Sequence, residues 1–312
     1  MVASSGDVPS QALGRAVVHE PEENCIYIAY GRTKDDAFLS DFWKFCIDSQ
    51  KWEKLQVNNV TPRAACGYAL VDERLWFFGG ITPSSYVSDL HYVDLKTLEV
   101  EYPLTTGPSP PPCALPLVAY FAPYLIVWAG TNGGPLTSLH ILNTEDMEWK
   151  KISTEIVGRQ GACGAIIDST LYIFGASSPF TILTLDLNTF EFTVVPVTGV
   201  EPPHKMDCLT AVVSGDQFLL FETNGVHNQT KVYVFDTTTS NWMSYSASVT
   251  KPSSDLDGCD PCIVFYLPDE RKLIALCDEN SDTANPIAEL SIGQSIATLN
   301  LRLDLLAALE CK

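Results

Sequence analysis

The sequence predicts an all-β protein that forms a six-bladed propeller, with four antiparallel strands in each blade. Short apolar strands recur along the chain, and several end at a residue pair that usually contains glycine. The pairs are Tyr30-Gly31, Gly79-Gly80, Ala129-Gly130 and Gly175-Ala176, with degraded copies at Glu222-Thr223 and Cys277-Asp278. Successive sites lie roughly 45 to 55 residues apart, which is the period of a repeat that forms one blade.

Two further markers keep the same period. An Asp or Asn that ends a strand precedes a large apolar residue, which suits the wedge between neighbouring blades. The strand-ending residues are Asp48, Asp94, Asn143, Asp186 and Asp236, and the apolar residues are Trp52, Val100, Trp149, Phe192 and Trp242. An arginine also stands sixteen residues before a glycine, from Arg15 to Gly31, Arg63 to Gly79 and Arg159 to Gly175. Three markers in phase indicate a repeat protein.

The repeats divide the 312 residues into a lead, one propeller and a tail. We expect a flexible lead over residues 1–10 and a tail over 303–312. The propeller spans 11–302, with blades over about 11–56, 57–106, 107–153, 154–197, 198–249 and 250–302. Each terminal blade can draw its four strands from its own repeat, so we expect sequential blades that close by face packing.

The composition narrows the class of partner. Hydrophobic residues make up 46% of the chain and charged residues 18%, which suits short strands joined by many turns. A net charge of −19 argues against binding nucleic acid or an anionic membrane through the overall field. The first residues contain no apolar signal segment, and no apolar run approaches the length of a membrane span. Ten cysteines without a signal segment predict reduced thiols in a cytoplasmic or nuclear protein.

The pattern resembles the kelch-repeat family over about residues 11–300. The resemblance rests on the glycine pair, on the steps Ser40-Asp41-Phe42-Trp43 and Ser88-Asp89-Leu90, and on the spaced tryptophans. It implies a kelch-type propeller, for which six blades are a common number. The third repeat departs from the pattern because Cys113 stands where the arginine is expected, and the fifth and sixth repeats lack the glycine pair.

The three arginines are the candidate binding residues. In a propeller the first strand of each repeat lies innermost, so Arg15, Arg63 and Arg159 are expected to point toward one mouth of the central channel. Arginine forms bidentate pairs with carboxylate or phosphate. The resemblance implies an acidic peptide as ligand, since kelch-like domains commonly bind one at this mouth. The alternative is that each arginine pairs with a loop aspartate or a backbone carbonyl and ties the blades together.

Two further clusters, one of cysteines and one of acidic residues, give weaker evidence for a metal site. Cys259 and Cys262 form a C-x-x-C pair that could bind zinc or cycle as a disulfide, but a second pair is missing. We therefore expect a structural role and keep them only as weak metal candidates. The acidic residues Asp255, Asp257 and Asp260 lack the EF-hand spacing and fit a solvated loop.

The histidines do not indicate catalysis either. The chain has five, at His19, His91, His140, His204 and His227. His91 and His140 occupy the same place in the second and third repeats, which indicates a structural repeat position. The chain contains no Walker loop, nucleophile elbow or H-E-x-x-H pattern. The sequence therefore predicts no catalysis and no cofactor.

These observations predict a non-catalytic, monomeric interaction module that binds a protein or peptide. The ligand is expected to be an acidic or phosphorylated segment bound at the loop face around the central channel. The module could be one domain of a larger adaptor or regulatory protein. Two alternatives stay open. One is a propeller enzyme or small-ligand isomerase that uses the channel, and the other is a scaffold that binds a basic partner through its acidic surface.

Overall fold

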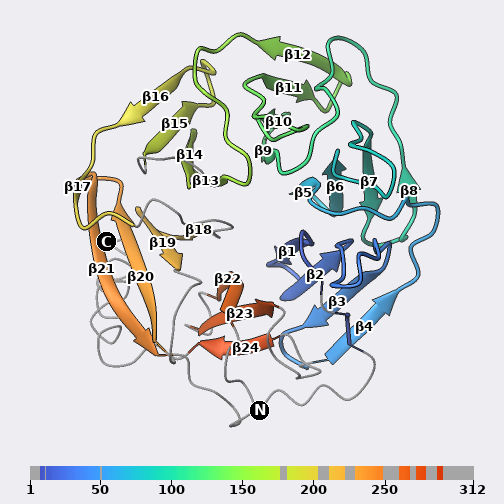
Figure 1. Cartoon of the computed structure of the whole chain (residues 1–312), viewed down its shortest axis with the longest axis horizontal. Helices are drawn as coiled ribbons and strands as arrows, with labels where there is room; N and C mark the ends of the chain where they lie inside the picture. Colours follow the sequence, from blue (N-terminus) through green and yellow to red (C-terminus); the bar gives the residue numbers. More distant parts are fainter. Residues whose placement is uncertain are drawn as a thin grey trace. The chain divides into compact units, whose positions relative to one another are not determined.

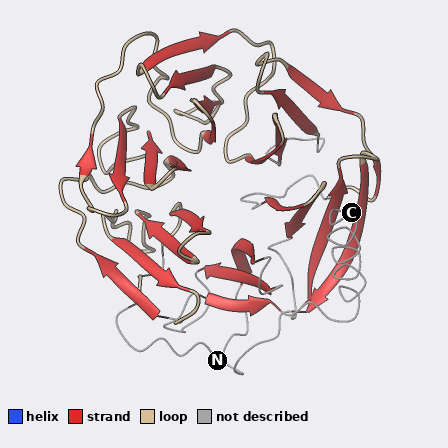
Figure 2. Cartoon of the chain, turned by 180° about the vertical axis from the view of Figure 1, so that it is seen from behind, coloured by secondary structure: helices blue, strands red, loops and turns tan. Residues whose placement is uncertain are grey.

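The computed structural model describes residues 8–10, 12–49, 51–175, 181–202, 211–221, 229–248, 260–267, 272–278 and 287–290 (Figure 1). Within these ranges every regular element is a β-strand, and Figure 2 shows only strands and loops there. Contacts divide the chain into two compact units. We call Ala3–Ala162 the N-terminal unit and the part from Cys163 onward the C-terminal unit.

The N-terminal unit contains three four-stranded antiparallel sheets, in each of which neighbours in sequence are neighbours in the sheet. The first has β1 (Ala16–Glu20), β2 (Cys25–Ala29), β3 (Phe42–Cys46) and β4 (Lys51–Leu55). The second has β5 (Gly67–Val71), β6 (Arg74–Phe78), β7 (Leu90–Asp94) and β8 (Val100–Glu101). The third has β9 (Leu117–Phe121), β10 (Tyr124–Trp128), β11 (Leu139–Asn143) and β12 (Glu148–Ile152).

The described part of the C-terminal unit also forms three sheets. The first has β13 (Cys163–Ile167), β14 (Thr170–Phe174), β15 (Ile182–Asp186) and β16 (Phe192–Val195). The second has β18 (Ala211–Ser214), β19 (Gln217–Phe221), β20 (Gln229–Asp236) and β21 (Asn241–Ser248), with the short β17 (Thr198–Gly199) added in parallel to β21. The third has β22 (Asp260–Leu267), β23 (Lys272–Asp278) and β24 (Ile287–Leu290).

The prediction of four-stranded antiparallel blades is therefore confirmed, but the number of blades needs correction. The described residues contain five complete blades, not six, because the last sheet has three described strands. The end of the sixth predicted blade, residues 291–302, lies outside the described residues, as do residues 1–7 and the tail over 303–312. The lead, the tail and the exact blade limits stay predictions.

The hydrophobic core of the N-terminal unit lies between its sheets. The second strands β2, β6 and β10 are buried at nearly every position, as expected for strands covered on both faces. The outer strands β4 and β12 bury only one residue each, Trp52 and Trp149. Trp149 packs in one cluster with Trp76 and Phe78 of the preceding sheet. The expected aromatic wedge between blades is thus present in the structure.

The two edges of each sheet in this unit carry different connections. Since the strands alternate in direction, the start of a first strand, the end of the second and the start of the third lie at one edge. We call this the loop edge. The loops 30–41, 79–89 and 129–138 within sheets and the connections 56–66, 102–116 and 153–162 between sheets begin and end there, although Thr106 of the second connection reaches the start of β12 at the opposite edge. The opposite edge carries the short turns between first and second and between third and fourth strands, and we call it the hairpin edge.

The second glycine of each pair connects one sheet to the next. The amide of Gly31 donates to the carbonyl of Arg63 at 2.9 Å, and the amide of Gly80 donates to the carbonyl of Cys113 at 2.7 Å. Gly130 does the same to Arg159 at 3.0 Å. The φ angles of these glycines are 115°, 103° and 88°, a region that residues with a Cβ rarely adopt. The first residue of the pair has φ near 60° in all three repeats, so a side chain is tolerated there.

The Gly80→Ala variant is expected to lower the free energy of unfolding by about 2 kcal/mol. A Cβ at Gly80 would lie 2.9 Å from the Ala64 carbonyl oxygen and 3.1 Å from the Cβ of Cys66, in addition to the strained φ. The matched change Ala129→Gly, at a first position with φ of 60°, should stay within about 0.5 kcal/mol of wild type. Urea unfolding measures the free energy of unfolding of both variants. An equal loss in the two variants would show that the second position of the pair does not require glycine.

Candidate functional site

Four turns follow one another along the loop edge of the N-terminal unit. Gly14, Ala65, Leu115 and Gly161 all have φ between 52° and 72° and precede the first strand of a repeat. Each bonds to the preceding one: Ala65 N to Gly14 O at 2.8 Å, Leu115 N to Ala65 O at 2.7 Å, and Gly161 N to Leu115 O at 3.1 Å. These bonds define equivalent positions in successive repeats and show where each arginine belongs.

The three arginines do not share one position. Arg63 and Arg159 each lie two residues before one of these turn residues, as does Cys113, whereas Arg15 follows Gly14 directly. The sixteen-residue spacing joined unlike residues, because Gly31 is a second glycine of its pair and Gly79 is a first. The expectation that the arginines form one repeated set is therefore wrong for Arg15.

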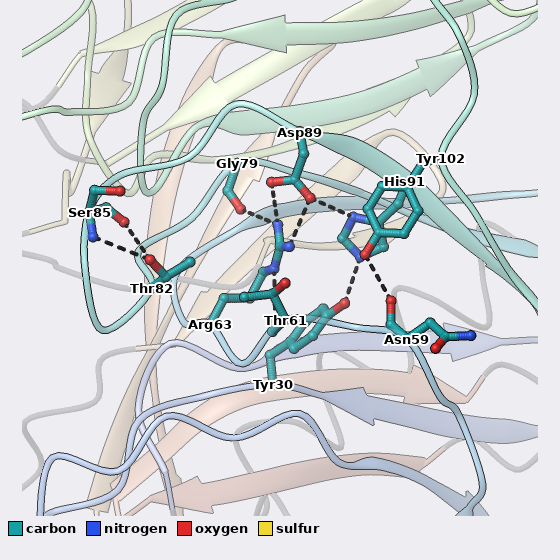
Figure 3. A network of polar contacts seen from close by, with 10 residues as sticks. All are labelled: Tyr30, Asn59, Thr61, Arg63, Gly79, Thr82, Ser85, Asp89, His91 and Tyr102. Carbon is teal, nitrogen blue, oxygen red and sulfur yellow. Dashed lines mark hydrogen bonds and ion pairs between the residues drawn. The ribbon is translucent and has the colours of Figure 1, made fainter.

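Arg63 is buried and fully engaged (Figure 3). Its Nη1 and Nη2 donate to Oδ1 and Oδ2 of Asp89 at 2.9 and 2.8 Å, a bidentate ion pair. Nη1 also donates to the Gly79 carbonyl at 3.0 Å, and Nε donates to the Thr61 carbonyl at 3.3 Å. With 1% of Arg63 exposed, this side chain has no free surface for a partner. The structure therefore supports the alternative interpretation, in which Arg63 pairs with a loop aspartate and backbone carbonyls, all of them in its own repeat.

A buried aromatic and histidine cluster extends this contact into the first repeat. The guanidinium lies over the ring of Tyr30 at 5.4 Å, and the Tyr30 hydroxyl is 2.6 Å from Nε2 of His91. The His91 ring is stacked between Phe77 and Tyr102, each at 5.2 Å between ring centroids. These side-chain contacts join Tyr30, the residue that follows β2 of the first sheet, to β6 and β7 of the second.

The electrostatics of the cluster match a fixed ion pair. Burial opposes ionisation of Asp89, but hydrogen bonds from His91 and Arg63 outweigh it and hold the pKa of Asp89 below its ordinary value. Burial lowers the pKa of His91, which is fully buried, and its contact with Asp89 only partly offsets this. Burial also raises the pKa of Tyr30. The cluster therefore holds one carboxylate, one guanidinium and a neutral imidazole at neutral pH.

The other two arginines differ in exposure. Arg15 is half-buried; its Nη1 donates to the Tyr30 carbonyl at 3.0 Å and its Nη2 bonds to the Ser10 carbonyl. Arg159 is 6% exposed. Contact of Arg15 and Arg159 with a partner stays a prediction, and Arg15 presents the larger surface of the two.

Most exposed apolar side chains of the N-terminal unit lie in segments at the loop edge. Five large apolar side chains are exposed in its described residues: Leu13 (51%), Tyr102 (45%), Leu104 (95%), Leu115 (37%) and Val157 (73%). All five lie in the lead into β1 or in the connections between sheets, and none lies in a hairpin. Leu104 is the exception, because it lies two residues before Thr106, whose amide donates to the Met147 carbonyl in a turn of the hairpin edge. The other four lie in neighbouring segments of the loop edge, and exposed apolar side chains grouped in this way are typical of an interaction site.

The hairpin edge has the opposite character. Its turns carry acidic residues at Glu22, Glu23, Asp48, Asp72, Glu73, Glu99, Glu145 and Asp146. Lys96 lies in one of these turns and pairs with Glu73 at 2.5 Å. The negative charge of the N-terminal unit is therefore concentrated at this edge, and an anionic partner would be repelled from it.

A cavity of about 500 Å³ opens at the loop edge of the third sheet, beside the connection 102–116. It is lined by Pro108, Ser109, Pro111, Pro135, Leu136, Thr137, Ser138, His140 and Lys151, without a carboxylate among them. Nδ1 of His140 is 2.9 Å from the Pro108 carbonyl, and Nε2 has no hydrogen-bond partner in the described part of the chain. Burial lowers the pKa of His140.

In the preceding repeat, side chains fill the space that is equivalent to this cavity. His91 and His140 are both second residues of third strands, so the predicted equivalence is confirmed. Around His91 the space holds Arg63, Asp89 and Tyr102, whereas Cys113, Ser138 and Lys151 take these places around His140. Smaller or flexible side chains thus replace an ion pair and a stacked ring. The sequence signals this cavity only through the missing arginine at Cys113.

The remaining predicted sites fall mostly outside the described residues. Cys259, Asp255 and Asp257 are not described, and Cys262 is described only as part of the backbone of β22. Within the described ranges no three His, Cys, Asp or Glu side chains are arranged to hold a metal ion. The search of those same ranges finds no helix long and apolar enough to cross a membrane.

Comparisons with known proteins agree with this architecture. The family model described as KLHDC2/KLHL20/DRC7 Kelch-repeats domain matches residues 1–176 and 125–259. Kelch domain-containing protein 10 of Xenopus tropicalis is 25% identical over 240 residues, covering 70% of this chain and 57% of that protein. Acyl-CoA-binding domain-containing protein 5 of Arabidopsis thaliana is 27% identical over 206 residues, covering 62% and 32%. Host cell factor of Drosophila melanogaster is 24% identical over 245 residues, covering 63% and 16%.

The match thus spans little more than half of the frog protein and smaller shares of the other two. The family model, by contrast, covers well over half of this chain, and its repeats coincide with four-stranded antiparallel sheets. The chain therefore belongs to the Kelch-repeat family of β-propellers.

Proposed function

We propose that this chain is a protein-interaction module that binds a segment of a partner protein at the loop edge of its N-terminal unit. The observation that carries the proposal is that four of the unit's five exposed large apolar side chains, all except Leu104, lie in segments at this edge. Leu13 and Leu115 flank the turns at the inner end of the first strands, where Arg15 also lies. Membership of the Kelch-repeat family supports protein partners in general.

The partner segment is acidic or phosphorylated in this proposal. Lys151 is the charged side chain in a cavity that has no carboxylate in its lining, and Arg15 is half-exposed beside the inner turns. The acidic hairpin edge would repel the same segment, so charge directs it to the loop edge. Arg63 contributes indirectly, because it fixes the loops that present these groups.

The proposal assigns no catalytic chemistry to the chain. The Asp89, His91 and Tyr30 cluster has the residue types of an acid–base site, but His91 and Tyr30 are 0% exposed. Their polar atoms are within reach of one another and of Arg63, under the stacked ring of Tyr102. A substrate would have to displace that ring to reach them, which favours a structural role.

Three broader expectations complete the proposal. The sequence repeat over about 250–302 is the sixth blade, as the repeat period predicts. The propeller is monomeric and acts in the cytoplasm or nucleus, as the ten cysteines suggest. It serves as one domain of a larger adaptor or regulatory protein.

The double variant Leu13→Asp/Leu115→Asp and the single variant Lys151→Glu are expected to weaken partner binding by at least about tenfold each. The first places charge on the apolar turns, and the second reverses the charge in the cavity. Affinity capture from cytosol, with the captured partner quantified against wild type, measures the loss.

The neighbouring change Lys150→Glu provides the matched control. Lys150 and Lys151 pair with Ile141 and His140 in β11, so they point to opposite faces of the sheet and carry the same charge. Lys150→Glu should leave binding unchanged. If the loop-edge variants bind normally and Glu99→Lys at the hairpin edge abolishes capture, the scaffold for a basic partner replaces this proposal.

A further inference from the structure

Two cysteines of the first sheet face each other at the hairpin edge. Cys25 begins β2 and Cys46 ends β3, and the two residues are direct partners in the antiparallel register. Their sulfur atoms are 3.2 Å apart although the residues lie 21 positions apart in sequence. Both are free thiols. The three other cysteines whose side chains are described are Cys66, Cys113 and Cys163, none of which is a register partner of another cysteine.

The backbone at this position suits a disulfide. Directly opposed residues of an antiparallel pair have Cα atoms about 4.5 or 5.5 Å apart, and disulfides span Cα separations of about 4.4–6.8 Å. Bond formation requires the sulfur atoms to approach from 3.2 Å to about 2.05 Å, a movement that side-chain rotation can supply. No strand needs to shift its register.

The two thiols differ in their surroundings. Cys25 is 2% exposed and its sulfur lies 3.2 Å from the Glu23 carbonyl as well as from Cys46. Burial, together with the hydrogen bond to Cys46, raises the pKa of Cys25 to about 12, so this thiol stays protonated. Cys46 is half-buried and is the thiol that solvent reaches. An oxidant therefore meets Cys46 first, with Cys25 in place behind it.

We propose that Cys25 and Cys46 form a reversible oxidation site at which hydroperoxides produce a cross-strand disulfide. The Cys46 thiolate attacks hydrogen peroxide, which forms an S–O bond, breaks the O–O bond and releases one water. The Cys25 sulfur then attacks the Cys46 sulfenic acid, so that the S–S bond forms and the hydroxyl leaves with the Cys25 proton as a second water. In total two thiols lose two protons and two electrons, and a dithiol reductant returns them.

The disulfide would act on stability and leave the binding edge unchanged. It joins the far ends of β2 and β3 at the hairpin edge, opposite to the loops that carry Leu13 and Leu115. A cross-link over 21 positions restricts the unfolded chain, and we expect the melting temperature to rise by roughly 5 °C.

The test treats the reduced full chain with hydrogen peroxide, blocks remaining thiols with N-ethylmaleimide and digests it with trypsin without reductant. Cleavage at Arg15, Arg32, Lys44 and Lys51 yields peptides 16–32 and 45–51, which carry Cys25 and Cys46. Mass spectrometry should find these two peptides joined, with the melting temperature raised and both effects reversed by dithiothreitol. In the Cys46→Ser variant the link and the oxidant-dependent rise should both vanish, whereas Cys66→Ser should keep them.

Recovery of both peptides as maleimide adducts after the methionines have already become sulfoxides would overturn the proposal. So would a link from Cys25 or Cys46 to any other cysteine. The result is independent of partner binding, since the assay needs no partner.

Discussion

The Arg63→Ala variant is expected to lose about 3 kcal/mol of unfolding free energy, a large part of the stability of an ordinary domain. The change leaves the Asp89 carboxylate, 32% exposed, without its bidentate partner. It also removes donors from the carbonyls of Gly79 and Thr61 and opens a gap beside Tyr30. Loss of one partner of a buried ion pair costs far more than loss of a surface pair.

Urea unfolding followed by tryptophan fluorescence measures the loss of unfolding free energy in the N-terminal unit itself. Five of the six tryptophans, Trp43, Trp52, Trp76, Trp128 and Trp149, belong to the N-terminal unit. The surface control is Arg32→Ala, because Arg32 pairs with Asp36 at 2.8 Å with 48% and 74% of the two side chains exposed. That variant should stay within about 0.5 kcal/mol of wild type. If Arg63→Ala unfolds like wild type while losing a partner, Arg63 is a binding residue and not a structural one.

Acidification is expected to destabilise the protein below about pH 6.5, in part through His91. The pKa of His91 is lowered from its ordinary value of 6.5 by burial, so the unfolded chain binds the proton more readily than the folded one. The stabilising contribution is complete above pH 6.5 and declines as the pH falls, with a slope of at most about 1.4 kcal/mol per pH unit for one proton. Arg63 and Asp89 are the charged groups that face this ring.

The His91→Gln variant isolates this contribution. His19 and His140 also have pKa values lowered by burial, so wild type and variant both retain some pH dependence. The variant should show a flatter decline of the urea midpoint between pH 7 and 5, because one titrating group is gone. Identical slopes would mean that folding does not lower the pKa of His91. Below about pH 4 a second loss is expected as Asp89, whose folded pKa is depressed, takes up a proton.

The repeat architecture could be predicted because it depends on local chemistry. The pair Gly79-Gly80 ends a buried strand where φ is positive and chains approach closely, and Trp149 fills the wedge between two sheets. Both features can be recognised from the local sequence, without knowledge of which distant residues they contact. Strand β10 (Tyr124–Trp128) likewise falls where the apolar run 125–128 predicts it.

The site could be predicted only in part, because its contacts join residues far apart in sequence. Counting sixteen residues to a glycine did not distinguish the first glycine from the second, which gave Arg15 a false equivalence with Arg63. The contact of Tyr30 with His91 spans 61 positions and depends on how two sheets pack. A signal for Asp89 was present in the sequence: it lies two residues before His91, which places both on one face of the strand. Ser138 likewise lies two residues before His140, so the third repeat has an uncharged serine where the second has the Asp89 carboxylate.

The most direct test of the central claim is hydrogen exchange of the full chain with and without its captured partner. Binding at the loop edge predicts slowed amide exchange in residues 109–116 and 153–162 and near Leu13, with the hairpin turns unchanged. Slowed exchange confined to the acidic turns around Asp48, Glu73 and Asp146 would contradict the account and identify the hairpin edge as the binding surface.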